Sequence, residues 1–243
     1  MNRTTRRQLL SASALVALTG TAFGRSFRNG LPWSPNEAYP PSPITPRAWQ
    51  FFSPDEVAAV DAIVDRLIPS DDLGAGGREA GCTVFIDRQL AGPYGVHDGL
   101  YMDGPFPPNP LPSQGLQSPV TPRQQYRQGL AALSAYCKAT YAGRVFASLS
   151  HEEQDALLTA MEKGEAKLPG YDGRSLFAAI YANTIEGYFA DPVYGGNRDM
   201  VGWKLVGFPG TRYDYRDVID KPNQPYMLPP VAMQGRPAWG QLP

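Results

Sequence analysis

The sequence LFAAIYANTIEGYF, residues 176–189, carries the strongest periodic pattern of the chain. Its apolar side chains recur at helical spacing and cover a wide face, which is typical of a helix that packs against several neighbours. The pattern consists of Leu176, Phe177, Ile180, Tyr181, Thr184, Ile185, Tyr188 and Phe189. We therefore expect this helix to lie at the centre of the fold.

The other predicted helices begin at recognisable capping signals. A Ser or Thr followed three residues later by Glu or Gln forms a capping box, as at Ser53, Thr121 and Ser150. Helical periodicity then predicts helices over about residues 53–68, 80–90, 121–142 and 150–163, and a short helix over residues 198–205. No stretch alternates convincingly as a strand. We predict an all-α fold: a single irregular helical domain of about five to six helices, over residues 51–212.

The rest of the chain is rich in glycine and proline. The 243 residues include 25 of each, which is high for a helical protein and predicts long ordered loops. Prolines exclude a regular helix from residues 25–50 and forbid regular structure in residues 91–120, and residues 213–243 are rich in proline again. We predict an extended N-terminal arm that lies on a surface, an extended C-terminal arm, and between them a domain with a long irregular loop. The net charge of −1 gives no electrostatic basis for binding nucleic acid.

Residues 1–24 have the features of an export signal. A basic start precedes a short apolar run, and Ala22–Gly24 is a candidate cleavage site. Arg6 and Arg7, followed by Gln8 and two leucines, are typical of a twin-arginine signal. The alternative is an ordinary secretory signal. The twin-arginine route carries folded proteins, so the chain either folds around a cofactor or escorts a partner that does.

The segment DPVYGGNRDMVGWKLVGFPG, residues 191–210, mixes glycines with large aromatic residues. Glycine permits close backbone approach, and the aromatic residues offer large areas for burial. Two interpretations follow: an irregular loop packed on the helical core, or a docking surface for a partner. The candidate docking residues are Tyr194, Gly195, Gly196, Asn197, Trp203 and Phe208.

A search for chemistry finds no convincing catalytic set, so no catalytic, cofactor-binding or metal-binding residue is assigned. The two histidines, His97 and His151, have no second ligand at metal-binding spacing. Cys82 and Cys137 are either a structural disulfide or two buried thiols. Two alternative functions stay open: a free-standing periplasmic enzyme with an unrecognised site, near residues 191–199 for instance, and a module that binds a small ligand.

The chain resembles the gluconate 2-dehydrogenase subunit 3 family. The most specific likeness is the string Asp-Pro-x-Tyr-Gly-Gly-Asn with the later Gly-Trp-x-x-x-Gly-Phe-Pro-Gly, at residues 191–197 and 202–210. The twin-arginine signal and residues 64–69 and 81–90 also match, so the resemblance covers nearly all of the mature chain.

The resemblance implies a small, non-catalytic subunit of a periplasmic dehydrogenase for sugars or sugar acids, held at the inner membrane through its complex. Its partners would be a large FAD-containing subunit, a multi-haem cytochrome c and the twin-arginine translocase. FAD and haem c would belong to those partners, with no cofactor in this chain. The small subunit would supply the export signal and stabilise the flavoprotein.

Overall fold

The computed structural model describes residues 49–107, 110–114, 118–212, 215–226 and 229–233. Within them the fold is all-helical, as predicted, with six α-helices and no strand beyond isolated bridges. The helices are α2 (Pro54–Leu67), α3 (Cys82–Ala91), α4 (Pro122–Thr140), α5 (His151–Glu162), α6 (Gly173–Phe189) and α7 (Val201–Val206). The predicted export signal and nearly all of the N-terminal arm lie outside the described residues.

Local sequence signals explain where the helices start. The capping boxes at Ser53, Thr121 and Ser150 all form, and proline occupies the first turn of α2 and α4. Asp172 caps α6 by accepting bonds from the backbone N–H groups of Arg174 and Ser175. Side-chain oxygens thus satisfy donors that a helix start leaves unpaired.

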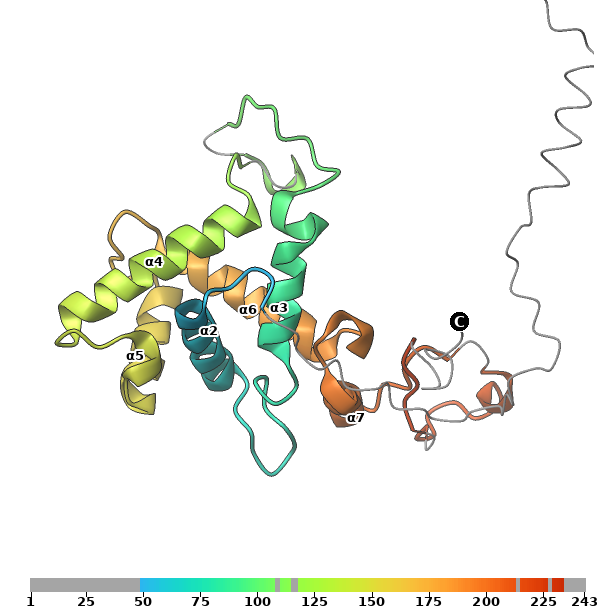
Figure 1. Ribbon diagram of the computed structural model, residues 1–243. Coiled ribbons are helices and arrows are strands. Elements are labelled where there is room, and N and C mark those ends of the chain that lie inside the picture. Colours follow the sequence, from blue (N-terminus) through green and yellow to red (C-terminus); the bar gives the residue numbers. More distant parts are fainter. Residues whose placement is uncertain (1–48, 108–109, 115–117, 213–214, 227–228, 234–243) are drawn as a thin grey trace, which may run out of the picture. The chain divides into compact units, whose positions relative to one another are not determined.

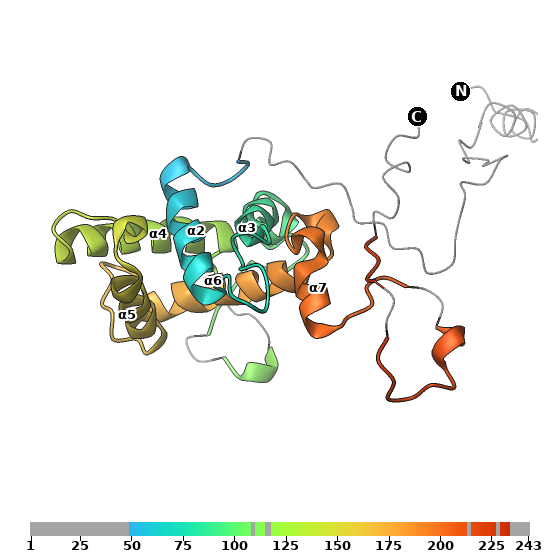
Figure 2. The ribbon, with the colours of Figure 1, turned by 90° about the horizontal axis from the view of Figure 1, so that it is seen from below.

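The central position predicted for residues 176–189 is confirmed. Helix α6 packs against α2, α3, α4, α5 and α7, and Figure 2 shows it running from α5 to α7 beneath α2 and α3. Leu176 and Ile180 are fully buried in the core. Figure 1 shows α4 crossing on the side of the core where the long loop joins it.

The long loop between α3 and α4 contains regular turns that the sequence analysis did not predict. Two 3-10 helices, η1 (Pro93–Val96) and η2 (Pro112–Gln114), each begin at a proline. Proline fixes the φ angle of the first position of such a turn, and its missing N–H group is not needed there. A proline-rich sequence therefore excluded a long helix but not single turns.

A buried carboxylate anchors the chain ahead of α2. Asp87 of α3 is almost fully buried, and its oxygens accept the backbone N–H groups of Gln50, Phe51 and Phe52, each at 2.9 Å. Arg127 of α4 adds a bond to the Phe51 carbonyl, and its guanidinium lies 4.0 Å from the centre of the Phe51 ring. These contacts fix the point at which the N-terminal arm joins the domain.

We expect Asp87→Asn to lower the free energy of unfolding by about 2 kcal/mol, because an amide cannot accept all three bonds and leaves a buried N–H group unpaired. Chemical denaturation measures the loss, and hydrogen exchange should quicken at residues 50–52. Asp155→Asn is the control, because its carboxylate pairs with the Arg66 guanidinium at the surface and is half exposed. Equal losses in the two variants would contradict the anchor.

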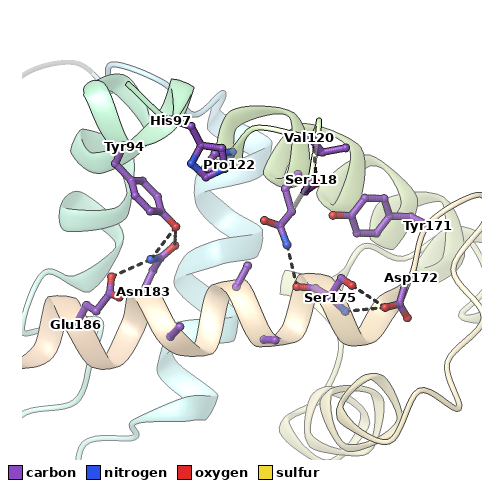
Figure 3. A pocket seen from close by; sticks show the side chains of 14 residues that line it. Tyr94, His97, Ser118, Val120, Pro122, Tyr171, Asp172, Ser175, Asn183 and Glu186 are labelled. Carbon is purple, nitrogen blue, oxygen red and sulfur yellow. Dashed lines mark hydrogen bonds between the residues drawn. The ribbon is translucent and has the colours of Figure 1, made fainter. Parts of the chain in front are cut away.

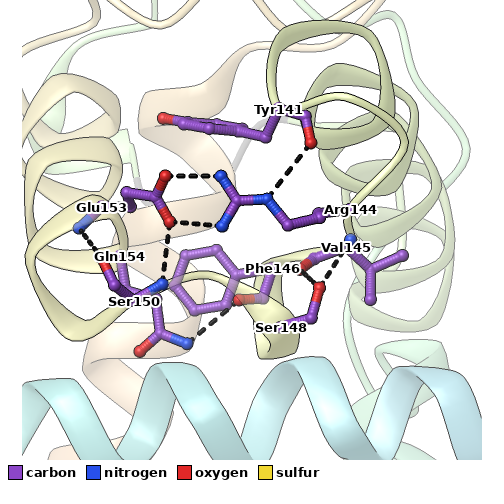
Figure 4. A network of polar contacts seen from close by, with 8 residues as sticks. All are labelled: Tyr141, Arg144, Val145, Phe146, Ser148, Ser150, Glu153 and Gln154. Atoms are coloured by element: carbon purple, nitrogen blue, oxygen red, sulfur yellow. Dashed lines mark hydrogen bonds and ion pairs between the residues drawn. The ribbon is translucent and has the colours of Figure 1, made fainter.

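A polar network joins the end of α4 to the start of α5 (Figure 4). The terminal guanidinium nitrogens of Arg144, Nη1 and Nη2, donate to the carboxylate of Glu153 at 2.8 and 2.5 Å. Glu153 also accepts the backbone N–H of Ser150, as the N3 member of the capping box. The hydrogen bonds from Arg144, followed by the bond from Ser150, lower the pKa of Glu153 from its usual 4.5 to about 2.

Because folding lowers the pKa of Glu153, its contribution to stability is complete above about pH 4.5 and is lost as the pH falls towards 2. NMR titration of the Glu153 carboxyl should give a midpoint near 2 in the wild type. In Arg144→Gln the midpoint should rise most of the way back to 4.5. A wild-type midpoint close to 4.5 would show that the pair does not form in solution.

Candidate partner-docking site

The segment after α6 begins with a carboxylate that holds two parts of the chain together. Asp191 is buried, and its Oδ1 accepts the N–H of Val193 at 3.0 Å, capping the 3-10 helix η4 (Pro192–Tyr194). Its Oδ2 accepts the N–H of Met233 at 2.8 Å. One side chain therefore orders the turn and also secures a segment of the C-terminal arm.

Gly196 allows this segment to lie directly against α6. A Cβ atom at that position would stand 2.1 Å from the carbonyl oxygen of Gly187. No side chain fits in that space, so the backbone contact requires glycine. The glycine predicted for a docking surface thus serves the packing of this chain on itself.

Asn197 is fully buried and connects the two helices on either side of the turn. Its Nδ2 donates to the carbonyl of Ala190 at 2.8 Å, and its Oδ1 accepts the N–H of Gly202 in α7 at 2.9 Å. Its φ of 45° lies in the left-handed region, which asparagine tolerates better than most residues. Its amide therefore sets the position of α7 relative to the end of α6.

Trp203 is the apolar anchor of α7. Its exposed fraction is only 4%, its indole Nε1 donates to the carbonyl of Phe189 at 2.7 Å, and it clusters with Met200 and Ala232. The ring of Phe208 meets its ring edge-on, with centroids 5.2 Å apart.

The C-terminal arm returns to this same place. Gly210 and Val231 form a parallel bridge, and the N–H of Thr211 donates to the carbonyl of Val231 at 2.7 Å. Ala232, buried beside Trp203, continues the contact. The Gly-Phe-Pro-Gly string, residues 207–210, therefore binds residues 229–233 of this chain. The arm was predicted to be extended; its described part also holds the 3-10 helix η6 (Arg216–Val218).

The six predicted docking residues divide into two sets. Gly195, Gly196, Asn197 and Trp203 are buried within this chain, whereas Tyr194 and Phe208 keep 48% and 46% of their surface exposed. Three more apolar side chains of the same segments are about half exposed: Leu205 and Val206 of α7, and Met233 of the C-terminal arm. We call Tyr194, Leu205, Val206, Phe208 and Met233 the α7 patch.

Sequence reasoning missed three members of the α7 patch for identifiable reasons. Leu205 and Val206 lie in a helix of six residues, which is too short to show which face is buried. Met233 lies 23 residues beyond Gly210, in the predicted arm, and long-range contacts such as its bond to Asp191 place it here. The one signal available in the sequence was the pair of adjacent apolar residues, Leu205 and Val206, at the end of this short helix.

The remaining candidate residues show no reactive arrangement. Cys82 and Cys137 are free, buried thiols that are not bonded to each other. Burial raises the pKa of Cys82 to about 12 and that of Cys137 to about 11, so both thiols stay protonated near neutral pH. Among the described residues, no three His, Cys, Asp or Glu side chains gather closely enough to hold a metal ion. In the same part of the chain, no helix has the length and apolar character to cross a membrane.

The structure is thus a helical domain in which residues 191–210 hold α7 and residues 229–233 against the end of α6. A family model, that of gluconate 2-dehydrogenase subunit 3, matches residues 54–210. The chain belongs to this family, and membership implies that it is a subunit of such a dehydrogenase complex. A search of curated proteins and a search of solved structures found no match.

Proposed function

We propose that this chain is the non-catalytic small subunit of a periplasmic FAD-dependent dehydrogenase for a sugar or sugar acid. It supplies the export signal for the folded flavoprotein and stabilises it, and a multi-haem cytochrome c accepts the electrons. The complex lies at the inner membrane. The observation that carries this proposal is the family match over residues 54–210. The match runs from the start of α2 to Gly210, the residue that pairs with the C-terminal arm.

The α7 patch is the surface that we assign to the flavoprotein subunit. Its five side chains are apolar and about half exposed, yet the backbone beneath them is fixed by the buried groups of Asp191, Asn197 and Trp203. A rigid apolar surface loses little conformational entropy on binding, so more of the contact energy appears as affinity. Aromatic anchors such as Tyr194 and Phe208 are enriched in such interfaces.

The escort role is tested by replacing Arg6 and Arg7 with lysines. We expect both this chain and its flavoprotein subunit to stay in the cytoplasm, because the twin-arginine pair is the only signal the proposal gives to either of them. Cell fractionation followed by immunoblotting of both subunits measures the result. Arg3→Lys is the matched control, since it lies outside the pair and should leave export unchanged. Export of the flavoprotein in the double variant would refute the escort role.

A further inference from the structure

Helix α6 is apolar around most of its circumference, yet one face of it is open. Ala178, Tyr181, Ala182 and Phe189 are exposed along that face, and the exposed fractions of Tyr181 and Phe189 are 48% and 37%. A helix that is apolar on all sides is typical of one that is covered on all sides. We therefore expect another chain of the assembled complex to cover the open face of α6.

A groove of about 630 Å³ runs along this face, on the side where α4 begins and the 3-10 helix η1 ends (Figure 3). Ala178 and Ala182 lie at its floor, and Tyr94 of η1 and Tyr171, which precedes α6, line its sides. The small floor residues give the groove its depth, and the tyrosine rings offer flat apolar surface. Extended peptide segments commonly bind grooves that have aromatic sides.

Glu186 is held in a fixed position at one end of this groove. Asn183, which is almost fully buried, donates from its Nδ2 to Glu186 Oε2 at 2.9 Å. The hydroxyl of Tyr126 donates to Asn183 Oδ1 at 2.8 Å, and the hydroxyl of Tyr94 lies 3.2 Å from Asn183 Nδ2. Figure 3 shows Tyr94 and Glu186 meeting at Asn183. A buried chain of hydrogen bonds thus orients an exposed carboxylate next to Tyr94.

Within the described residues, no cation of this chain compensates the Glu186 carboxylate. The lining of the groove contains Asp172 and Glu186 but no lysine or arginine, and Glu186 belongs to none of the ion pairs in that part of the chain. Carboxylates form strong hydrogen bonds with guanidinium and ammonium groups, and tyrosine rings attract the same cations. The Glu186 end of the groove therefore suits a lysine or arginine side chain.

The same end of the groove leads to the α7 patch. Phe189 lies three residues beyond Glu186, and its carbonyl accepts the indole N–H of Trp203 at 2.7 Å. A Cβ atom at Gly202 would stand 3.2 Å from the Phe189 ring, so α7 lies directly against this side chain. The partly exposed Phe189 thus connects the open face of α6 with α7. One partner can cover the groove and the α7 patch together.

We propose that an extended segment of the flavoprotein subunit binds in this groove, with a lysine or arginine paired with Glu186. The choice of partner rests on the proposed function, which assigns the adjoining α7 patch to that subunit. The rest of the segment covers Ala178 and Ala182 between the two tyrosines. The five apolar side chains of the α7 patch provide no charged contact, whereas a charge pair at Glu186 fixes the register of the partner.

Titration calorimetry of the full chain with the purified flavoprotein subunit tests the charge pair. Glu186→Gln keeps an oxygen that accepts from Asn183 but removes the charge. We expect it to weaken binding at least about tenfold, because the partner's cation is left buried without its counter-ion. Glu152→Gln is the matched control, since it makes the same change at an exposed position of α5 outside the groove. It should bind as the wild type does.

A second pair of variants tests the groove floor. Ala182→Trp fills the groove and should also weaken binding at least about tenfold, because its side chain clashes with the segment. Ala135→Trp adds the same side chain at an exposed position of α4 outside the groove and should leave the affinity unchanged. Melting curves check that all the variants fold.

The outcomes separate this proposal from the proposed function. Wild-type affinity in either Glu186→Gln or Ala182→Trp would overturn the placement in the groove, while binding of the flavoprotein subunit by the wild type would still support the proposed function. No binding by the wild type would overturn both. Loss of affinity in the two groove variants, with both controls unchanged, is the result that we expect.

Discussion

Replacing Gly196 with alanine should destabilise the protein by about 3 kcal/mol or more, which is a large part of the stability of an ordinary domain. The added methyl group would stand 2.1 Å from the Gly187 carbonyl oxygen, so the backbone of either α6 or the following turn must move. That movement would also disturb the bonds that Asn197 makes to Ala190 and Gly202. Chemical denaturation measures the loss.

Gly74→Ala is the matched control for Gly196→Ala. A Cβ atom at Gly74 meets nothing within 4 Å, so we expect a change of no more than about 0.5 kcal/mol. If Gly196→Ala were equally harmless, the close contact between the turn and α6 would not exist in solution. The account of the glycine-rich string as a packing element would then fail.

Removing two aromatic side chains of the α7 patch should have the largest effect on assembly. Interface aromatics often contribute about 2 kcal/mol each, so Tyr194→Ala combined with Phe208→Ala should weaken binding of the flavoprotein subunit about a thousandfold. Both side chains are about half exposed, so the isolated domain should lose much less stability than affinity. Titration calorimetry of the purified subunits measures the binding, and melting curves measure the stability.

The control for the α7 patch is a double variant elsewhere on the surface. Leu73→Ala with Tyr101→Ala removes an aliphatic and an aromatic side chain that are each 78% exposed, and neither belongs to the patch. We expect this variant to bind the flavoprotein as the wild type does. Equal affinities in the two double variants would move the interface away from α7.

The sequence was sufficient to predict the helices because their signals are local. The capping boxes at Ser53, Thr121 and Ser150 fix helix starts through contacts three residues apart, and all three form. The central role of residues 176–189 followed from apolar side chains around most of the helix, a pattern that requires neighbours on several sides. Each of these inferences depends on spacing within one element.

The packing of residues 191–210 could not be derived in the same way. Glycine and tryptophan have the same appearance in the sequence whether they pack on their own chain or on a partner, and here Gly196, Asn197 and Trp203 pack inward. The anchoring role of Asp191 was not predicted, because its bond to Met233 spans 42 residues. Contacts over such separations leave no periodic signal.

The left-handed backbone conformation of this turn could not be predicted from the sequence either. Asp199 and Met200 have φ angles of 56° and 58°, and such angles cost a long side chain roughly 1–2 kcal/mol. The burial of Met200 beside Trp203 and Ala232 offsets that cost. Only the assembled cluster shows why methionine occupies the position.

The most direct test of the central claim is purification of the complex through a tag on this chain, followed by mass spectrometry and flavin absorbance. The account predicts that an FAD-containing dehydrogenase subunit co-purifies in a fixed ratio, and that the flavin leaves with that subunit when the two are separated. A chain that purifies as a monomer and itself holds the flavin, or itself oxidises a sugar acid, would contradict the account.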